Sequence, residues 1–346
     1  MSASPRIASL ATTAVSVGIG AVGYGLAWLL SVPAPILIGP AVAVSLAGLT
    51  GLRTGVDPLV RDISFVILGF GIGCGFTAEA GAAILHWPLA FVALGVSLFL
   101  TLVLCRDLLV RIFGFDPASA VLASAPGHLS YVMSLTVETG SDIGQVAVVQ
   151  SIRLLALTLI VPFAALAMGY PMGTLGTIGG APMGWDVLAL LLAASAVLGW
   201  IFLRLRLTAP LLLGPMVVAG ATHIGGTVEG GVPLLLLTPA FLVLGTVIGT
   251  RFSGMSLAAL RASALAGSAV TLLGAVIASV AGLPVAMALG MPVAHVLVAF
   301  APGGLETMVA LGAVMGVSPG FVAACHIMRL LILTGLIPFT LGRARA

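Results

Sequence analysis

The segment APGGLETMVALGAVMGVSPGFVAACHIMRLLILTGLIPF, residues 301–339, aligns without a gap with APGHLSYVMSLTVETGSDIGQVAVVQSIRLLALTLIVPF, residues 125–163. Among the residues that recur 176 positions later, Pro126, Gly127, Leu129, Gly140, Gly144, Arg153 and Pro162 return as Pro302, Gly303, Leu305, Gly316, Gly320, Arg329 and Pro338. Upstream, APILIGP at 34–40 returns as APLLLGP at 209–215, and FVILGFGIG at 65–73 returns as FLVLGTVIG at 241–249. The chain is therefore predicted to be an internal duplication with halves 1–173 and 174–346.

The composition indicates that these repeats lie in a lipid bilayer. Of 346 residues, 60% are hydrophobic and 7% are charged, whereas roughly a quarter of the residues of a soluble domain are charged. Uncharged runs extend over residues 7–52, 154–185 and 262–305, and each is longer than the ~20 residues that one spanning helix needs. The sequence therefore predicts an all-α polytopic membrane protein whose long apolar runs are divided at glycine and proline residues.

The arginines predict how the halves are oriented. The chain has 13 arginines and no lysine, and most of them stand singly between apolar segments. Cytoplasmic loops of membrane proteins carry an excess of such residues. If each half has five transmembrane helices plus a re-entrant or broken helix at the APGxL motif, the second half is inverted and 11 of the 13 arginines fall on the cytoplasmic side. We therefore predict two inverted repeats in a multi-pass protein of the bacterial inner membrane.

The two remaining arginines, Arg153 and Arg329, occupy equivalent positions in the last apolar span of each half. About ten residues into a helix that rises 1.5 Å per residue, each is expected near the bilayer midplane. An arginine at that depth is costly unless it faces a partner or a polar cavity, so it is a candidate functional residue. A structural alternative stays open, because each guanidinium has five N–H donors and could cap free carbonyl groups of the broken helix in its own half.

The Pro-Gly pairs of the two APGxL motifs predict helix breaks that meet near the middle of the membrane. Breaks at that depth are tolerated only where they are buried in protein or line a wet cavity. Secondary transporters build substrate sites from such breaks in inverted repeats, and paired arginines suit a small anion. The predicted substrate-binding residues are Pro126, Gly127, His128, Ser130, Arg153, Pro302, Gly303, Gly304, Glu306, His326 and Arg329.

Glu306 is the first charged residue after the uncharged run of residues 262–305, and its counterpart in the first half is Ser130. Because the carboxylate belongs to one half only, it is our candidate for coupling substrate movement to H⁺ or Na⁺. His326 lies one turn before Arg329, as Gln150 lies one turn before Arg153. Residues at this spacing share a helix face with the arginine, so His326 is expected either to line the cavity or to pack within the protein.

The motifs APGGLETMVALGAVMGV and AACHIMRLL, with the first copy APGHLSYVMSL and VVQSIRLL, resemble the AbrB or ammonia monooxygenase type of membrane protein, a family defined by a duplicated hydrophobic unit. The resemblance covers nearly the whole chain. It implies two activities, oxidation of ammonia and regulation of gene expression. Family members usually carry Ser-Glu where this chain has Glu306 and Thr307, so the family role of the carboxylate is transferred with a shift of one position. The general plan is also similar to that of the sodium-coupled glutamate and citrate symporters, as an analogy of fold.

The residues themselves favour an ion-coupled secondary carrier for a small anionic metabolite over an enzyme. No two of the five histidines lie three or four residues apart, so the sequence predicts no metal site and no cofactor. It offers no basic stripe for nucleic acid. A non-transporting sensor that affects gene expression indirectly remains the alternative, a membrane monooxygenase is a weaker one, and homo-oligomer formation is left open.

Overall fold

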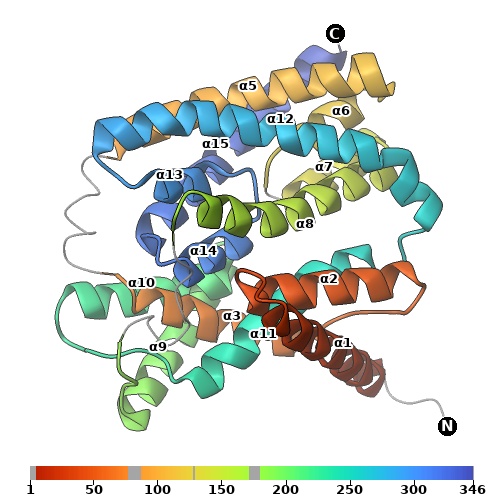
Figure 1. Ribbon diagram of the computed structural model, residues 1–346. Coiled ribbons are helices and arrows are strands. Elements are labelled where there is room, and N and C mark those ends of the chain that lie inside the picture. Colours follow the sequence, from red (N-terminus) through yellow and green to blue (C-terminus); the bar gives the residue numbers. More distant parts are fainter. Residues whose placement is uncertain (1–4, 77–86, 128, 171–179, 346) are drawn as a thin grey trace. The chain divides into compact units, whose positions relative to one another are not determined.

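The computed structural model describes residues 5–76, 87–127, 129–170 and 180–345, and this part of the chain is mainly helical (Figure 1). The helices are α1 (Pro5–Leu29), α2 (Pro35–Leu49), α3 (Pro58–Gly73), α5 (Pro88–Phe113), α6 (Pro117–Ser124), α7 (Leu129–Thr139), α8 (Ile143–Ala167), α9 (Trp185–Arg204), α10 (Pro210–Ile224), α11 (Leu234–Gly249), the 3-10 turn η3 (Thr250–Phe252), α12 (Leu257–Leu289), α13 (Val293–Phe300), α14 (Leu305–Val314) and α15 (Pro319–Arg345). An isolated parallel bridge joins Pro182 to Gly231.

In the described part of the chain, seven segments are long and apolar enough to cross a membrane. They lie in α1, α5, α8, α9, α11 with η3, α12 and α15, whereas α2, α10 and α14 are apolar but shorter. Many large apolar side chains face outward, and α12 alone exposes Leu265 by 76%, Leu272 by 66% and Met287 by 82%. In water such a surface would aggregate, but lipid tails are as apolar as these side chains. The predicted class, an all-α polytopic membrane protein, is confirmed.

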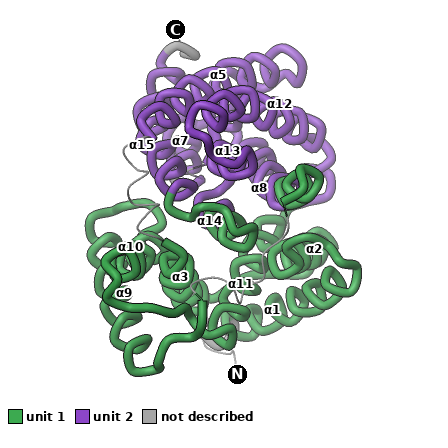
Figure 2. Tube along the Cα trace, turned by 60° about the vertical axis from the view of Figure 1, so that its left-hand side comes forward, with its two compact units in different colours: residues 1–83, 161–255, 309–320 green, residues 84–160, 256–308, 321–346 purple. Residues whose placement is uncertain are grey.

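The chain forms two compact units, drawn in different colours in Figure 2. Unit 1 contains residues 1–83, 161–255 and 309–320, and unit 2 contains residues 84–160, 256–308 and 321–346. Each unit therefore takes segments from both predicted halves, 1–173 and 174–346. The halves and their inversion stay predictions from the sequence, because compactness is a different property from repetition.

In unit 1, the two copies of the AP…GP motif have the same local backbone. Ala34 caps the start of α2 with φ 48°, and Ala209 caps the start of α10 with φ 45°. Both alanines are in the left-handed region and precede a proline at the first helical position, which has no N–H to leave unpaired. The motif therefore starts a short helix in the same way in each half.

Glycine allows the helices of unit 1 to touch through their backbones. A Cβ on Gly39 of α2 would overlap Gly23 of α1, and a Cβ on Gly214 of α10 would lie 2.7 Å from the Cα of Gly199 of α9. Small residues are the usual means of packing helices in a bilayer, where van der Waals contact replaces the hydrophobic effect. In both helix pairs, a glycine of the AP…GP motif thus lies against a glycine of the preceding helix.

Contacts in unit 1 also cross between the halves. A Cβ on Gly69 of α3 would overlap the carbonyl of Leu212 in α10, and a Cβ on Gly245 of α11 would lie 2.9 Å from the carbonyl oxygen of Leu37 in α2. Both glycines belong to the paired FVILGFGIG and FLVLGTVIG segments. The third apolar segment of each predicted half is therefore packed on the second segment of the other predicted half.

A polar cluster holds the start of α3 against α1. The Asp57 side chain caps α3 by accepting from the backbone N–H of Leu59 at 2.9 Å, and the Ser9 hydroxyl donates to the same carboxylate at 2.9 Å. The backbone N–H of Asp57 donates to the Thr13 hydroxyl at 2.7 Å. Asp57 is 7% exposed, so its hydrogen bonds are partly shielded from water.

We expect Asp57→Ala to lower the free energy of unfolding by about 1–2 kcal/mol, because it removes a helix cap and leaves the Ser9 hydroxyl without this acceptor. The measurement is thermal unfolding of the purified protein in detergent. Asp62→Ala is the control, since Asp62 pairs with Arg61 at an exposed position, where ion pairs contribute little. Equal effects of the two substitutions would contradict the role given to Asp57.

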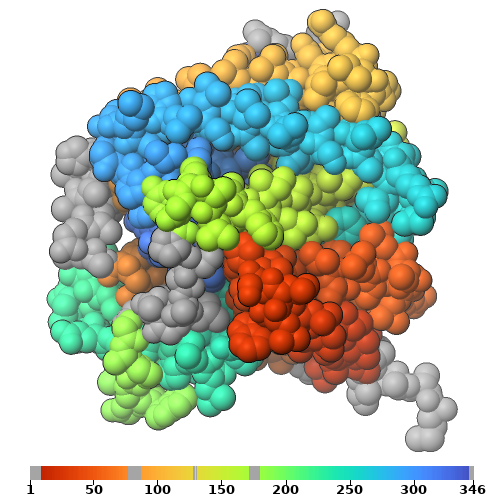
Figure 3. Space-filling view, viewed as in Figure 1, coloured from red at the N-terminus to blue at the C-terminus, as the bar shows by residue number. Residues whose placement is uncertain are grey.

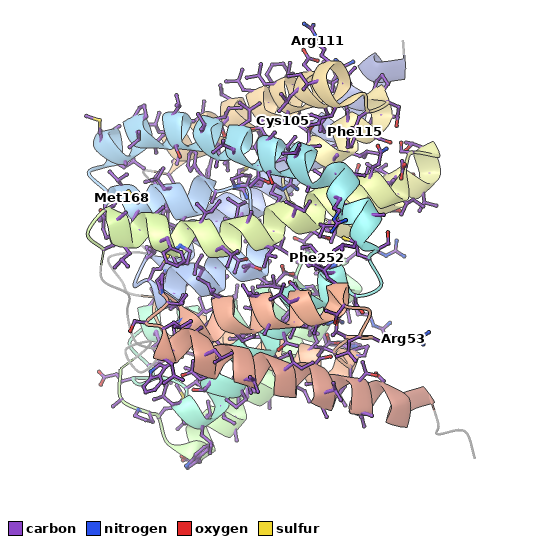
Figure 4. The ribbon with its side chains drawn as sticks, turned by 45° about the vertical axis from the view of Figure 1, so that its right-hand side comes forward. Arg53, Cys105, Arg111, Phe115, Met168 and Phe252 are labelled. Atoms are coloured by element: carbon purple, nitrogen blue, oxygen red, sulfur yellow. The ribbon has the colours of Figure 1, made fainter. Side chains whose placement is uncertain are left out.

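In unit 2, α12 packs on α5 and α13, and α5 packs on α6. Figure 3 shows α12 as a long band, light blue and cyan, across the outer face of this unit. Beneath it lies a buried apolar cluster to which α5 contributes Leu102, Cys105 and Leu109, and Figure 4 labels Cys105 and Phe115 in this region. This packing supports the short helices α6 and α13, which end at the APGxL motifs.

Candidate functional site

Both APGxL motifs lie at helix interruptions. Helix α6 ends at Ser124 and α7 begins at Leu129, while α13 ends at Phe300 and α14 begins at Leu305. Gly127 has φ 87°, a conformation that residues with a side chain rarely adopt. The helix breaks predicted from the Pro-Gly pairs are confirmed, although the side of the membrane from which each segment enters stays a prediction.

The two breaks lie next to each other within unit 2. A Cβ on Gly127 would lie 3.6 Å from the carbonyl oxygen of Gly303 and 3.8 Å from the Cδ atom of Arg329. Pro302 of the second break lies beside α12, since its Cγ would be 3.5 Å from a Cβ on Gly274. The tertiary structure thus brings together two motifs that are 176 positions apart in the chain.

Arg153 caps the end of α6. Its guanidinium donates to the carbonyl oxygens of Ala123 at 3.4 Å, Ser124 at 3.3 Å and Ala125 at 2.6 Å. These carbonyls have no intrahelical partner, because they belong to the last turn of a helix. The side chain is 4% exposed, so the cap lies inside the protein.

Arg329 caps α13 in a related way. It donates to the carbonyl oxygens of Ala299 at 3.1 Å and Phe300 at 3.0 Å, and it reaches beyond the helix end to Gly303 at 3.4 Å. Arg329 is 1% exposed. The sequence left open whether each arginine caps the broken helix of its own predicted half. The hydrogen bonds of both arginines are of this capping kind. We call each arginine with its capped carbonyls a clamp, the Arg153 clamp and the Arg329 clamp.

The hydrogen bonds of the clamps do not neutralise their charge. Arg61, Arg106 and Arg111 form ion pairs, whereas no carboxylate among the described residues pairs with Arg153 or Arg329. The two clamps hold adjoining helix breaks, since a Cβ on Gly127 would lie 3.8 Å from the Cδ atom of Arg329. Carbonyl dipoles stabilise a cation only in part, so two positive charges in an apolar setting favour an anionic partner.

The residue one turn before each arginine differs between the clamps. Gln150 donates through Nε2 to the carbonyl oxygens of Leu122 at 2.9 Å and Ala125 at 3.0 Å, and its Oε1 accepts from Arg153. His326 contacts the carbonyl of Val322, one turn back on its own helix, through Nδ1 at 3.0 Å. Gln150 was paired with His326 in the sequence but was not predicted to be a site residue. Its signal was its place beside Arg153, where an amide can donate to carbonyl oxygens of the same helix end.

Three buried polar atoms of this region have no hydrogen-bond partner among the described residues. They are His326 Nε2 and Arg329 Nε in the Arg329 clamp, and the Ser124 hydroxyl beside the Arg153 clamp. Unpaired polar atoms are uncommon in protein interiors and each requires an explanation. Here they gather where two helix breaks meet.

Glu306 lies in the first turn of α14 and is half-buried. A carboxylate is favourable at this position, because the start of a helix carries a partial positive charge. Its Oε2 lies 4.0 Å from the position that a Cβ on Gly304 would take, and Leu154 Cδ1 lies 3.1 Å from the same position. The predicted Glu306, Gly304 and Pro302 thus all lie at the second break.

Two predicted site residues, His128 and Ser130, are not described in full by the structure. His128 lies outside the described residues. Ser130 lies in α7, which places its backbone after the first break, and its side chain is outside the described part. The remaining predicted residues, Pro126, Gly127, Arg153, Pro302, Gly303, Gly304, Glu306, His326 and Arg329, belong to the two breaks or the two clamps.

The helices and this site define a class: an all-helical, multi-pass membrane protein in which two buried arginines hold two interrupted helices. The family model described as "Transition state regulatory protein AbrB" matches residues 36–344, and the chain belongs to the AbrB family. It is also 25% identical over 307 residues to "Uncharacterized protein YhjN" of Bacillus subtilis (strain 168), which covers 83% of this chain and 79% of that protein. The resemblance carried by the APGxL and MRLL motifs is confirmed.

Proposed function

We propose that this protein is a secondary carrier for a small anionic metabolite in the bacterial inner membrane, and that it is not an enzyme. The observation that carries the proposal is the pair of buried guanidinium charges, without a carboxylate partner among the described residues, at two adjoining helix breaks. Broken helices are the recurrent substrate sites of secondary transporters. An anion bound there would supply the missing negative charge.

In this proposal the two arginines have two roles, capping helix ends and attracting the substrate. The clamps keep the helix ends of α6 and α13 satisfied inside an apolar setting, so that the chain can stay interrupted without loss of stability. The excess positive charge then attracts the substrate. Because both guanidinium charges are buried at adjoining helix breaks, an anion bound between or beside them would be favoured by Coulomb attraction to both.

The direct test is uptake of radiolabelled anions by proteoliposomes that contain the purified protein, with an imposed pH or Na⁺ gradient. Uptake above that of protein-free liposomes, and competition by unlabelled anion, would support the carrier. Lack of flux for every anion that binds the protein would contradict it.

The second candidate is a membrane sensor that binds the same ligand without moving it. The description of the family model as a regulatory protein favours it. A sensor would show ligand binding in detergent and no flux in proteoliposomes, so the same preparation separates the two functions. A membrane monooxygenase is the third and weakest candidate, and its activity would be lost on treatment with a metal chelator.

We expect Glu306→Gln to uncouple uptake from the ion gradient while substrate exchange across the membrane continues. The substitution keeps the size of the side chain but removes its charge at the start of α14, so no proton or cation can be held there. The measurement compares gradient-driven uptake with exchange in the same proteoliposomes. Asp62→Asn, at an exposed site in α3, is the control. Uphill uptake with unchanged pH and Na⁺ dependence in Glu306→Gln would exclude this carboxylate as the coupling group.

A further inference from the structure

His223, in the last turn of α10, contacts two carbonyl oxygens at once. Its Nδ1 lies 2.8 Å from the carbonyl oxygen of Ala219, one turn back on the same helix. Its Nε2 lies 2.8 Å from the carbonyl oxygen of Gly230, in the loop of residues 225–233 between α10 and α11. These residues belong to unit 1, whereas both clamps belong to unit 2. His223 is therefore outside the site described above.

The two contacts determine the protonation state of the ring. A carbonyl oxygen can only accept, so each ring nitrogen must carry a proton to form a hydrogen bond at this distance. The neutral ring has one N–H group and one lone pair, and only the imidazolium has an N–H group on both nitrogens. The geometry therefore fits a positively charged His223.

The position of His223 on the helix also favours a positive charge. Helix α10 ends at Ile224, and the end of a helix carries a partial negative charge from its unpaired carbonyl groups. The side chain of His223 is half-buried, so its ring can exchange protons with water. Histidine ordinarily changes its charge between about pH 5 and 8, so the charge of this ring is expected to depend on pH.

Other titratable groups near this end of α10 come from the loop and from the helices packed on α10, which are α3 and α9. The loop contributes Glu229, the first turn of α9 contributes Asp186, and α3 ends at the buried Cys74, while α11 has none. Both carboxylates are exposed, and neither forms an ion pair with His223 in the described part of the chain, which leaves out residues 77–86. The two carbonyl oxygens are therefore the hydrogen-bond acceptors that stabilise the charged ring.

The matching helix of the first half lacks this histidine. Helices α2 and α10 both start at the AP…GP motif and both contain 15 residues. Gly48 occupies the position in α2 that His223 occupies in α10. A helix of this length thus forms without an imidazole in its last turn, which indicates that His223 serves the loop rather than the helix.

The contact with Gly230 connects three parts of unit 1. The next residue, Gly231, donates to the carbonyl oxygen of Ala181 at 2.8 Å and accepts from the backbone N–H of Met183 at 3.0 Å, and this segment leads into α9. His223 thus joins the end of α10 to the loop and, through the loop, to the start of α9. When the ring loses one proton, one nitrogen presents a lone pair to a carbonyl oxygen, and that contact is no longer a hydrogen bond.

We propose that His223 is a pH-sensitive latch on the loop of residues 225–233. At acidic pH the imidazolium donates to Ala219 and Gly230 and fastens the loop to the end of α10. As the pH rises, loss of one proton breaks one of the two bonds, the ring turns, and the loop is released. The latch is independent of the proposed anion site, and it applies to a carrier and to a sensor alike.

The protonation of the ring is tested by ¹⁵N NMR of the full chain in detergent, with ¹⁵N-labelled histidine side chains. The signals of His223 are those that disappear in His223→Gln. At about pH 5.5 both ring nitrogens should carry a proton, and at about pH 8.5 only one should. A single ring proton at about pH 5.5 would contradict the double contact, and two ring protons at about pH 8.5 would make it a permanent bond instead of a latch.

Release of the loop is tested with a nitroxide spin label on Glu229→Cys. This position is exposed, and the native cysteines are buried. The substitution also removes the carboxylate of the loop as a source of pH dependence. The label should gain a mobile component in its EPR spectrum as the pH rises from about 5.5 to about 8.5.

Two further variants of the labelled protein assign the response to one ring. His223→Gln should abolish the pH dependence, because an amide does not titrate, whereas His295→Gln in α13 should keep it. A response that persists in His223→Gln would overturn the proposal. If His223→Gln does not fold, the labelled protein with His223 decides, since a spectrum that does not change with pH would equally overturn it.

The stability of the protein should follow the same titration. The double contact needs the protonated ring, so its contribution to stability is present at acidic pH and is lost as the pH rises. The Tm of the unaltered protein minus that of His223→Gln should fall by about 2 °C or more between about pH 5.5 and 8.5. A difference that stays constant with pH would show a structural role without a switch.

Discussion

Gly39→Ala is expected to lower the free energy of unfolding by about 3 kcal/mol, at the upper end of the cost of overpacking, or to prevent accumulation of folded protein. The added Cβ would lie 2.6 Å from the carbonyl carbon of Gly23 and 2.8 Å from the Cα of Tyr24. All of these are backbone atoms, so rotation of a side chain cannot relieve the overlap. Helices α1 and α2 would have to separate along their shared face. Thermal unfolding in detergent, followed by tryptophan fluorescence, measures the effect.

Gly25→Ala provides the control. Gly25 lies on α1 beside the contact, and a Cβ there would meet no atom within 4 Å. Alanine favours a helix interior over glycine by up to about 1 kcal/mol, so this variant should be as stable as the unaltered protein or slightly more stable. A similar loss of stability in Gly25→Ala and Gly39→Ala would show that helix propensity rather than close packing governs this region.

Arg153→Gln is expected to have the second large effect, a loss of about 3 kcal/mol or more. Three carbonyl oxygens at the end of α6, together with Gln150 Oε1, lose a charged donor, and each unsatisfied buried group costs about 1–3 kcal/mol. Removing a buried charge returns part of this cost, because the charge no longer has to be desolvated. The measurement is again thermal unfolding of the purified variant.

Arg111→Gln is the matched control, because Arg111 is 79% exposed and lies 4.0 Å from Asp107. Exposed ion pairs of this kind contribute 0 to about 1 kcal/mol, so stability should hardly change. Unaltered stability of Arg153→Gln would mean that the carbonyls at the break find other partners, and the structural role given to Arg153 would then be wrong.

The sequence alone was sufficient to predict the class of the protein and the position of its helix breaks. The scarcity of charged residues predicts spanning helices, because a charge in lipid is costly wherever it stands in the fold. The Pro-Gly pairs at 126–127 and 302–303 predict interruptions for a reason local to the backbone, since proline cannot donate a hydrogen bond. Arg153 and Arg329 could likewise be identified as unusual from their depth in apolar segments.

The tertiary structure decided what those arginines contact and which segments lie together. The sequence left open whether each guanidinium caps carbonyls or faces a ligand, because five donors can serve several acceptors and only three-dimensional placement selects among them. It also could not show that segments of both halves combine in each compact unit, since packing between distant segments depends on surfaces that form only after the helices do.

The difference between Gln150 and His326 is the clearest case. In the sequence they are equivalent positions, one turn before an arginine. In the fold the amide reaches carbonyl oxygens of the adjoining helix break, whereas the imidazole bonds back to Val322 and its Nε2 has no partner among the described residues. Residue type determined which polar atoms are present, and side-chain geometry in the folded protein determined which of them remain available to a ligand.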